Sequence, residues 1–307
     1  MLLNSKITAM TSNSDILTEC DKAFLTSLLD ILKKHLPREI RGYNTIYNYW
    51  YHYDKINGNR ANLRSDRWNF QFYRHRYGKA ENCTLISISG LKDYIIGLFT
   101  LEPSGTELME CIQETKLINW QHKFLDIMCN EQHFDLVKGI VQKKCDGWIL
   151  LPVENIMWIS KEKVDKLELN VTLPSDVHVA PLSSDKHSEI IADHWYYKSE
   201  NTFYLVKESI EFNGGLGIFR RSSNGQPICW LATNEFFTPG FLYTIESERR
   251  KGFAKYLLAA ELKRLCIQHG LDMYSYVSNG NANSLKLHEQ LGFETVNRLT
   301  WLEKTTS

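Results

Sequence analysis

The chain has 307 residues, and its 36 basic side chains balance 36 acidic ones, so it carries no net charge. Apolar residues make up 43 % and charged residues 23 %, which is ordinary for a globular protein and excludes disordered, collagen-like and coiled-coil classes. Proteins that bind nucleic acid or an anionic membrane normally carry a basic excess or a basic block, and this sequence has neither. We therefore expect no nucleic-acid partner and no membrane association.

The sequence predicts a protein of the cytoplasm with reduced cysteines. Its longest nearly uninterrupted apolar run, residues 94–101, is far shorter than the ~20 residues that span a bilayer. The first twenty residues show neither a secretory signal nor an arginine-rich transit peptide. Seven widely spaced cysteines predict neither a disulfide framework nor zinc ligands, and most are expected to be buried thiols. The histidines lack metal-ligand spacing, so we predict no metal.

Residues 21–150 predict a first α/β half after a loose segment, 1–20. Apolar residues at helical spacing predict a helix over 21–36, which Pro37 ends. Ser104 and Glu107 have the spacing of a capping box that opens another helix. The aromatic residues of 43–53 could form a core or strand face, or line an acyl or amine pocket. The remaining expected elements are strands near 68–73, 85–88 and 94–101 and a helix over 130–144.

Residues 151–175 have a looser pattern that ends at Pro174, and we interpret them as a connection to a second domain, 176–307. Asn224-Gly225 predicts a tight β-hairpin because both positions tolerate positive φ. A long helix over 251–269 is expected to end at Gly270. The other expected elements are strands near 177–179, 240–245, 273–277 and 295–302 and helices over 184–195, 199–212 and 283–291.

The segment that carries the clearest chemistry joins the strand near 240–245 to the long helix. There Arg249, Gly252 and Ala254 follow an Arg-x-x-Gly-x-Gly/Ala pattern. Small residues allow the backbone to approach a phosphate, and the free amides and dipole of the helix start attract it. This pattern indicates a diphosphate site, although a solvated basic turn would have the same residues.

Downstream residues extend the pattern. Asn281, Ser284 and the 287–293 segment, Leu-His-Glu-Gln-Leu-Gly-Phe, follow the next strand. With the basic turn, they resemble the GCN5-related N-acetyltransferase (GNAT) superfamily over about 176–303. More narrowly, residues 215–219, 225–230 and 249–252, together with Trp195, look like the glycine N-acyltransferase family.

The resemblance implies an α/β (α+β) GNAT fold, a mixed twisted sheet flanked by helices. Length and strand-helix order suggest that a second GNAT-like half precedes it. Acyl-CoA, the expected co-substrate, would lie in a V-shaped split between the strand ending near Ile245 and the strand 273–277. Its thioester carbonyl would accept a backbone N–H near 242–244, an interaction that stabilises the oxyanion. The predicted cofactor-binding residues are Thr244, Ile245, Arg249, Arg250, Gly252, Phe253, Ala254, Lys255, Asn281 and Ser284.

The acid-base residues depart from the family. Thr238 stands where the glycine N-acyltransferase family has its glutamate, so Glu235 is either a substitute base or an exposed hairpin residue. His288 stands where many members have a tyrosine that protonates the leaving thiolate, but it could be a surface residue. Asn281 could contact the pantetheine arm or cap a helix. The predicted catalytic positions are Leu242, Tyr243, His288 and Glu235.

The predicted function is acyl transfer from acyl-CoA to the amine of a small acceptor, such as the amino acids glycine or glutamine. One alternative is an acyl-CoA-binding protein with little or no activity, which the loss of the glutamate favours. The other is a protein N-acetyltransferase, which the even charge balance supports poorly. Mitochondrial import is suggested only by the family resemblance, and the oligomeric state is left open.

Overall fold

The computed structural model describes residues 15–90, 94–169, 172–222 and 224–304. The strands are β1 Leu17–Glu19, β2 Gln71–His75, β3 Leu85–Ile88, β4 Tyr94–Phe99, β5 Leu125–Asn130, β6 Trp148–Leu150, β7 Glu154–Ile159, β8 Val177–Pro181, β9 Gly215–Arg220, β10 Pro227–Thr233, β11 Pro239–Thr244, β12 Met273–Ser278 and β13 Glu294–Lys304. The helices are α2 Lys22–Leu32, α3 Ile40–Tyr51, α4 Tyr53–Asn59, α5 Thr106–Glu114, α6 Phe134–Lys144, α7 Lys161–Asp165, α8 Ser184–Asp193, α9 Thr202–Asn213, α10 Phe253–His269 and α11 Ala282–Gln290.

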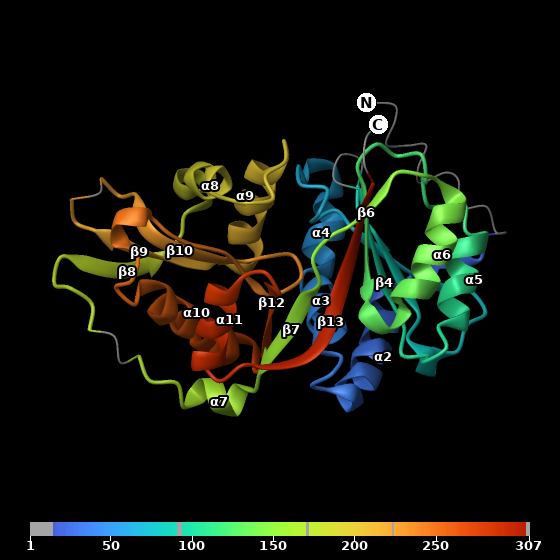
Figure 1. The fold of residues 1–307 in the computed structure, drawn as a ribbon, viewed down its shortest axis with the longest axis horizontal. Helices are drawn as coiled ribbons and strands as arrows, with labels where there is room; N and C mark the ends of the chain where they lie inside the picture. Colours follow the sequence, from blue (N-terminus) through green and yellow to red (C-terminus); the bar gives the residue numbers. More distant parts are fainter. Residues whose placement is uncertain (1–14, 91–93, 170–171, 223, 305–307) are drawn as a thin grey trace.

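These strands form two sheets, drawn in Figure 1. The larger has nine strands in the order β1-β2-β3-β4-β5-β13-β7-β12, and β6 pairs with β13 beside this path. The smaller has the order β11-β10-β9-β8. Among the residues that the structure describes, β4 and β5 pair in parallel and all other neighbouring strands are antiparallel. The mixed sheet flanked by helices that the sequence predicts is therefore confirmed.

Helices cover both sheets and also separate the two halves. Helices α5 and α6 pack on the N-terminal strands, and α10 packs on the smaller sheet. Helices α3 and α4 lie between the two halves in Figure 1. Helix α3 is bonded to the C-terminal half: the Asn44 amide donates to the Asp272 carbonyl at 3.1 Å, and the Asn48 amide donates to the Glu235 carbonyl at 2.9 Å. A packed helix thus joins the halves.

Elements with strong local signals form as predicted. The Asp21 carboxylate accepts the Phe24 N–H at 2.8 Å and caps α2. In the hairpin between β9 and β10, Asn224 and Gly225 have φ of 49° and 79°, as the tight turn requires. Helix α10 ends at Gly270, whose φ is 68°.

Two N-terminal expectations were incomplete or wrong. The aromatic run of 43–53 belongs to α3 and α4, not to a strand, because the intervening polar residues follow helical spacing. The capping box is absent: the N-cap of α5 is Gly105, with φ 64°, which has no side chain that could accept a hydrogen bond. The Glu107 carboxylate instead accepts the Asn82 side-chain amide at 2.8 Å and the Lys79 N–H at 3.1 Å. Tertiary partners thus replace the local cap.

The segment expected as a connection contains a central strand. Strand β7 pairs with β12 on one side and β13 on the other, so it lies inside the larger sheet. It joins two strands of the C-terminal half to each other. Short α7 follows it and packs against α10.

All seven cysteines are free thiols, and six of them are buried. Burial raises the pKa of Cys229 and of Cys266 to about 12, so both fit the prediction of inert core thiols. Within the ranges that the structure describes, no helix has the length and apolar character needed to cross a membrane.

Candidate functional site

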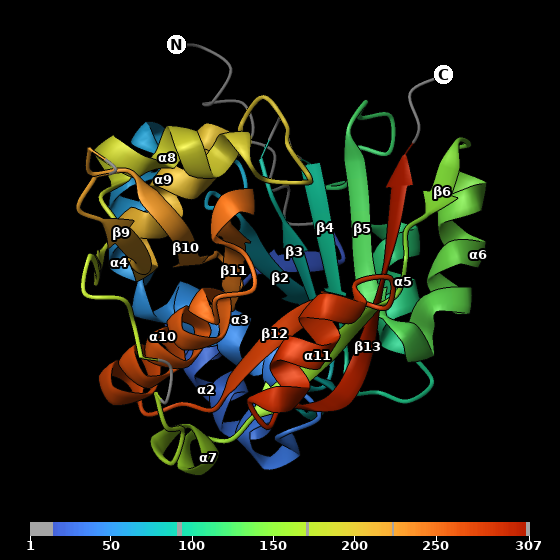
Figure 2. The same ribbon diagram turned by 60° about the vertical axis from the view of Figure 1, so that its left-hand side comes forward.

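Strands β11 and β12 border the candidate site from different sheets, as Figure 2 shows, and among the described residues they share no ladder. A hydrogen bond joins the two strands where both begin: the Thr238 hydroxyl donates to the Tyr274 carbonyl oxygen at 2.7 Å, and we call this bond the tie. The Tyr274 hydroxyl donates to the Phe236 carbonyl oxygen at 2.8 Å and closes the same end. The strands are thus joined at one end and unpaired beyond it, which is the separation that the GNAT resemblance implies.

A β-bulge interrupts β11 beside this split. Trp230 of β10 pairs with Tyr243 and Ala232 pairs with Gly240, so two residues, Phe241 and Leu242, face the single intervening position. Phe241 has φ 55°, a left-handed conformation that costs a bulky residue energy. Its ring offsets part of this cost by packing 4.8 Å from the ring of Trp195. Because a bulge takes backbone groups out of the ladder, this is where β11 can present an amide to a ligand.

The Tyr243 side chain is already engaged on the smaller sheet. Its ring stacks on Trp230 at 5.1 Å and lies 4.7 Å from the ring of His194. The Arg249 guanidinium lies 5.3 Å from the same ring, and its Nε donates to the Thr244 carbonyl at 3.1 Å. The backbone of Tyr243 is paired with Trp230 in the β10–β11 ladder as well, so both its ring and its backbone belong to the smaller sheet.

The turn from β11 to α10 presents a run of free amides. Arg250 has φ 62° and Gly252, the N-cap of α10, has φ 82°, so the chain turns sharply into the helix. Across the described part of the chain, no acceptor is bonded to the N–H groups of residues 250–255, and the first bonded amide is that of Tyr256. Free amides and the dipole of a 17-residue helix attract anions, so this turn is compatible with the diphosphate site, which stays a prediction.

The charged side chains around this turn divide into bound and unbound groups. The Glu248 carboxylate accepts from Lys251 at 2.9 Å, and its two oxygens both accept from Nη2 of Arg220, at 2.8 and 2.9 Å. These bonds, that of Lys251 first, lower the pKa of Glu248. Arg250 and Lys255 are exposed and form no ion pair within the described ranges. They are thus the cations available to a diphosphate.

The start of α11 holds the other predicted ligand residues. The Asn281 side chain accepts the Ser284 N–H at 3.1 Å and caps the helix. His288 is not on the surface: it is 5 % exposed, and burial lowers its pKa. The neutral ring donates from Nδ1 to the Ser284 carbonyl at 2.8 Å. That bond uses the proton that a thiolate would need, so His288 is a weak candidate for the acid.

Glu235 is the predicted residue whose surroundings differ most from expectation. It is not an exposed hairpin residue, because it is 1 % exposed and ion-paired to Arg67 at 2.5 Å. The Arg67 Nε also donates to it at 2.6 Å. Arg67 lies 168 residues away in sequence, so no local pattern could reveal the pair. A buried carboxylate held by a guanidinium is poorly placed to remove a proton from an amine.

One carboxylate near the split was missed by the sequence analysis. Glu154 begins β7 and is only partly buried, and its Oε2 accepts the Trp301 indole N–H at 3.0 Å. Burial raises its pKa, while that bond and the charge of Arg67 lower it to a smaller extent. A glutamate opening an otherwise apolar run was the only signal available.

The N-terminal half repeats the order strand, helix, strand, helix in β4, α5, β5 and α6, but its equivalent of the split is closed. Strands β4 and β5 are paired in parallel. Arg41 bridges their far ends, donating to the Leu98 carbonyl at 3.3 Å and to the Asn130 side chain at 3.0 Å. At the start of α5, the Glu102 carboxylate accepts the Glu107 N–H at 2.8 Å. A carboxylate of the chain thus occupies the place that an anion would take.

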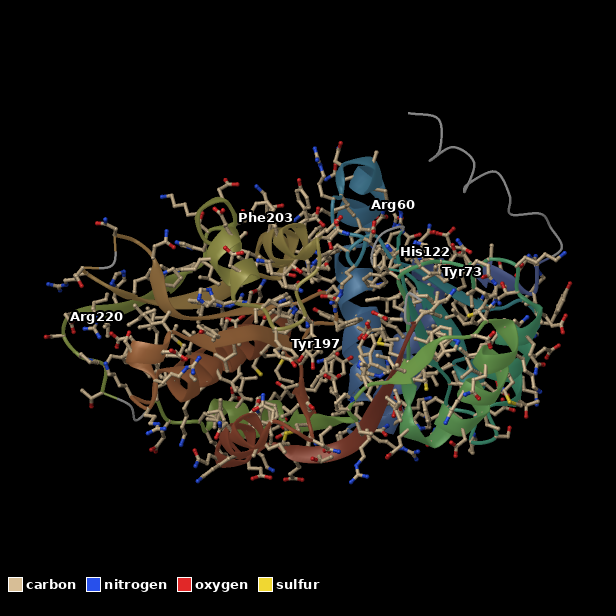
Figure 3. The ribbon with its side chains drawn as sticks, turned by 45° about the horizontal axis from the view of Figure 1, so that its top comes forward. Arg60, Tyr73, His122, Tyr197, Phe203 and Arg220 are labelled. Atoms are coloured by element: carbon tan, nitrogen blue, oxygen red, sulfur yellow. The ribbon has the colours of Figure 1, made fainter. Side chains whose placement is uncertain are left out.

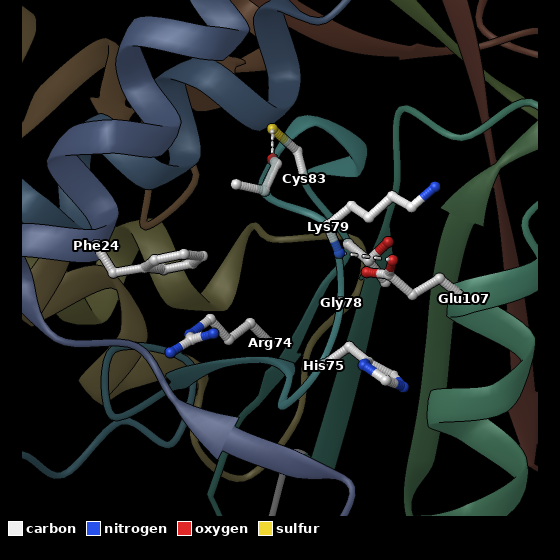
Figure 4. Close-up of a pocket in the computed structure, with 9 residues that line it drawn as sticks. Phe24, Arg74, His75, Gly78, Lys79, Cys83 and Glu107 are labelled. Atoms are coloured by element: carbon white, nitrogen blue, oxygen red, sulfur yellow. Dashed lines mark hydrogen bonds between the residues drawn. The ribbon is translucent and has the colours of Figure 1, made fainter.

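A pocket in this half, shown in Figure 4, contains none of the predicted site residues. Its charged groups serve the fold: the Arg74 guanidinium lies 4.5 Å from the ring of Phe24, and Glu107 bonds Lys79 as described above. Among the described residues, no cluster of three or more His, Cys, Asp or Glu could hold a metal ion.

Comparison with known proteins agrees with this geometry. Residues 215–302 match a family model described as FR47-like protein, and residues 16–140 match one described as a domain of unknown function (DUF5645). No curated protein gave a significant match to the sequence.

Three solved structures show how widely the fold is shared. A Drosophila protein is 22 % identical, with a TM-score of 0.86 over 95 % of this chain and 99 % of its own. A GCN5-related N-acetyltransferase from Kribbella flavida is 14 % identical, with a TM-score of 0.51 over 73 % of this chain and 87 % of its own. One from Sphaerobacter thermophilus is 10 % identical, with a TM-score of 0.53 over 76 % and 80 %.

Proposed function

We propose that this chain, which has the fold of the GNAT superfamily, transfers an acyl group from acyl-CoA to the amine of a small acceptor. The observation that carries the proposal is the run of free amides at the start of α10, next to the split between β11 and β12. As acceptors we propose amino acids such as glycine or glutamine, because the motifs of residues 215–219 and 225–230 resemble glycine N-acyltransferases.

The coenzyme would be held at both sides of the split. The amides of residues 250–255 would bind its diphosphate, and the unpaired cations Arg250 and Lys255 would add charge. The pantetheine arm would then extend along the edge of β11 at Thr244 and Ile245 and past the α11 start at Asn281 and Ser284. Because Asn281 uses its side-chain oxygen as a cap, only its side-chain nitrogen remains for that arm.

The reaction would take place at the bulge. The backbone N–H of Leu242 would donate to the thioester oxygen and stabilise the negative charge that forms as the amine attacks, whereas Tyr243 is paired with Trp230 of β10. The carbon–nitrogen bond forms, the carbon–sulfur bond breaks, and coenzyme A leaves as a thiolate. Because His288 has committed its proton, water is the more direct proton source for that thiolate.

A second candidate function is an acyl-CoA-binding protein without transfer activity. It is favoured by the carboxylate that is missing at Thr238, whose hydroxyl is bonded to the Tyr274 carbonyl. It is also favoured by the ion pair that engages Glu235.

One assay separates the two functions. The purified chain is incubated with acyl-CoAs of different length, with and without amino acids or other amines, and free thiol is measured. Transfer predicts thiol release that depends on the amine, whereas the binding protein predicts saturable binding without release.

The coenzyme site is tested separately by Arg250→Glu. Its charge should repel the diphosphate and weaken CoA binding at least tenfold in calorimetry. Lys143→Glu makes the same charge change at an exposed position of α6 and should leave affinity unchanged. Equal affinities of the two variants would remove the site assignment.

A further inference from the structure

Glu154 lies on the side of the split opposite the coenzyme helices. In the register of β7 and β12, Glu154 faces Ser278 and Ile156 faces Tyr276, so these side chains share one face of the sheet. Ile156 packs with Phe236 and Tyr276 on that face, while Met157, its neighbour in sequence, packs with residues of α10 on the other. An acceptor approaching from the Glu154 face would therefore meet the coenzyme from the opposite side.

Glu154 also lies close to the level of the bulge along the split. The hydrogen bond from Thr238 to Tyr274 fixes a common starting point for the two strands. Leu242 is four residues beyond Thr238, and Ser278, the partner of Glu154, is four residues beyond Tyr274. The bulge takes up one residue of β11, so at about 3.3 Å per strand position Leu242 lies ~10 Å and Ser278 ~13 Å beyond the Thr238–Tyr274 hydrogen bond. The strand positions of Glu154 and of the proposed oxyanion donor thus differ by about one residue along the split.

The charged and titratable groups that face Glu154 come from four elements. Besides the larger effect of burial, the charge of Arg67 lowers the pKa of the Glu154 carboxylate. The negative charge of Glu154 in turn adds to the burial that raises the pKa of Tyr276 in β12 and of Tyr197 in the loop between α8 and α9. Glu235, which is ion-paired to Arg67, also contributes to the raised pKa of Tyr276. Figure 3 places Tyr197 between the two halves, and this ring is about half exposed. Arg67 is ion-paired to Glu235, whereas Glu154 forms no ion pair within the described ranges, so Glu154 carries the less compensated negative charge of the group.

We propose that Glu154 receives the proton of the acceptor's ammonium group, a role that rests on the proposed acyl transfer and deepens it. The bound ammonium transfers one proton to the Glu154 carboxylate and becomes a neutral amine. The amine attacks the thioester carbon, the carbon–nitrogen bond forms, and the carbon–sulfur bond breaks. The amine's remaining surplus proton passes to solvent, the thiolate takes a proton from water, and Glu154 releases its proton to solvent before the next turnover. Acceptors that enter as small cations past Tyr197 fit this site.

The test is Glu154→Gln, which keeps the bond from the Trp301 indole but cannot take a proton. At pH 7, kcat/KM for the amine should fall 10- to 100-fold while CoA affinity stays unchanged. Above the pKa of the amine the rate should recover, because the acceptor is then already neutral. Glu154→Asp should retain part of the activity. Glu189→Gln, an exposed glutamate of α8, is the matched control and should behave as the wild type.

Three outcomes would overturn the proposal. Glu154→Gln could keep kcat/KM and its pH profile within twofold of the wild type, which shows that no proton passes through this residue. It could lose CoA affinity in parallel with activity, which shows a structural role. Its activity could stay low above the amine pKa, which shows that the defect is not in deprotonation. A wild-type chain that releases no thiol with any amine would instead refute the proposed function itself.

Discussion

Lowering the pH from 7.5 to 5 should cost this protein about 2 kcal/mol of folding stability through the side chain of His52 alone. The ring is 9 % exposed and lies between the halves, 5.1 Å from the ring of Phe212. Its Nε2 is 3.0 Å from the side-chain oxygen of Asn213, whose amide group donates to the Asn234 carbonyl. The histidine must therefore donate from Nε2, as a neutral ring does.

The magnitude follows from the difference in proton affinity between the folded and unfolded chains. Burial lowers the pKa of His52 from 6.5 to about 4, so at low pH the unfolded chain binds a proton that the folded chain does not. At ~1.4 kcal/mol per pKa unit the full effect is about 3 kcal/mol. The stabilisation is complete above pH 6.5 and is lost as the pH falls toward 4. By pH 5 about 2 kcal/mol of it is gone.

The measurement is urea unfolding followed by tryptophan fluorescence at both pH values. His52→Gln retains a donor for Asn213 but does not titrate. Between pH 7.5 and pH 5, the free energy of unfolding should therefore fall by about 2 kcal/mol less in this variant than in the wild type. His35→Gln, at an exposed position, is the control and should follow the wild type. His269, whose pKa is also lowered to about 4 by burial, is present in all three chains and cancels in the comparison. An NMR titration that puts the His52 pKa at 6.5 or higher would refute the reasoning.

Three further predictions concern the split and the junction of the halves. Thr238→Val removes the donor to the Tyr274 carbonyl. We expect urea titration to show a loss of about 1–3 kcal/mol in the free energy of unfolding, and the KM for acyl-CoA to rise. An unchanged KM would show that this hydrogen bond does not maintain the coenzyme site. Arg67→Leu leaves the buried Glu235 carboxylate without its cation and should lower the free energy of unfolding by about 3–5 kcal/mol. The double variant Arg67→Leu/Glu235→Leu should regain much of that stability. Equal losses of stability in the single and the double variant would contradict a charge effect. Calorimetry should give one coenzyme per chain, because β4 and β5 are paired where β11 and β12 are apart, and a stoichiometry of two would be inconsistent with that closure.

Local interactions account for what could be predicted from the sequence. The cap of α2 and the hairpin at Asn224-Gly225 depend on residues within a few positions of each other, and both form as expected. The turn into α10 is also local, because the positive φ of Gly252 and the free amides that follow it belong to one short segment. Half of the candidate site was therefore visible in the sequence.

Long-range pairing accounts for what could not be predicted. The exposure assigned to Glu235 was wrong because its partner Arg67 lies in the other half. The segment around Glu154 reads as a connection, and only the register with β12 and β13 shows that it is a central strand. The Ser104 and Glu107 pattern failed for a related reason, since Asn82 and Lys79 provide stronger partners for Glu107 than the local backbone does. Spacing alone cannot rank such alternatives.

The position of β7 explains why the two halves are built as one unit. In the described part of the chain, β12 pairs only with β7, so the strand that borders the split receives its one neighbour from the segment before residue 176. The unpaired edge of β12 therefore faces the split, and its paired edge is held by the strand that carries Glu154. Helix α3 reinforces this arrangement by bonding to Asp272, just before β12, and to Glu235 near the tie. In the proposed site, the C-terminal half contributes the free amides and the bulge, while β7, from the segment between the halves, contributes the carboxylate and the support of β12. A site built in this way would couple the geometry of the proposed acyl transfer to the packing between the halves.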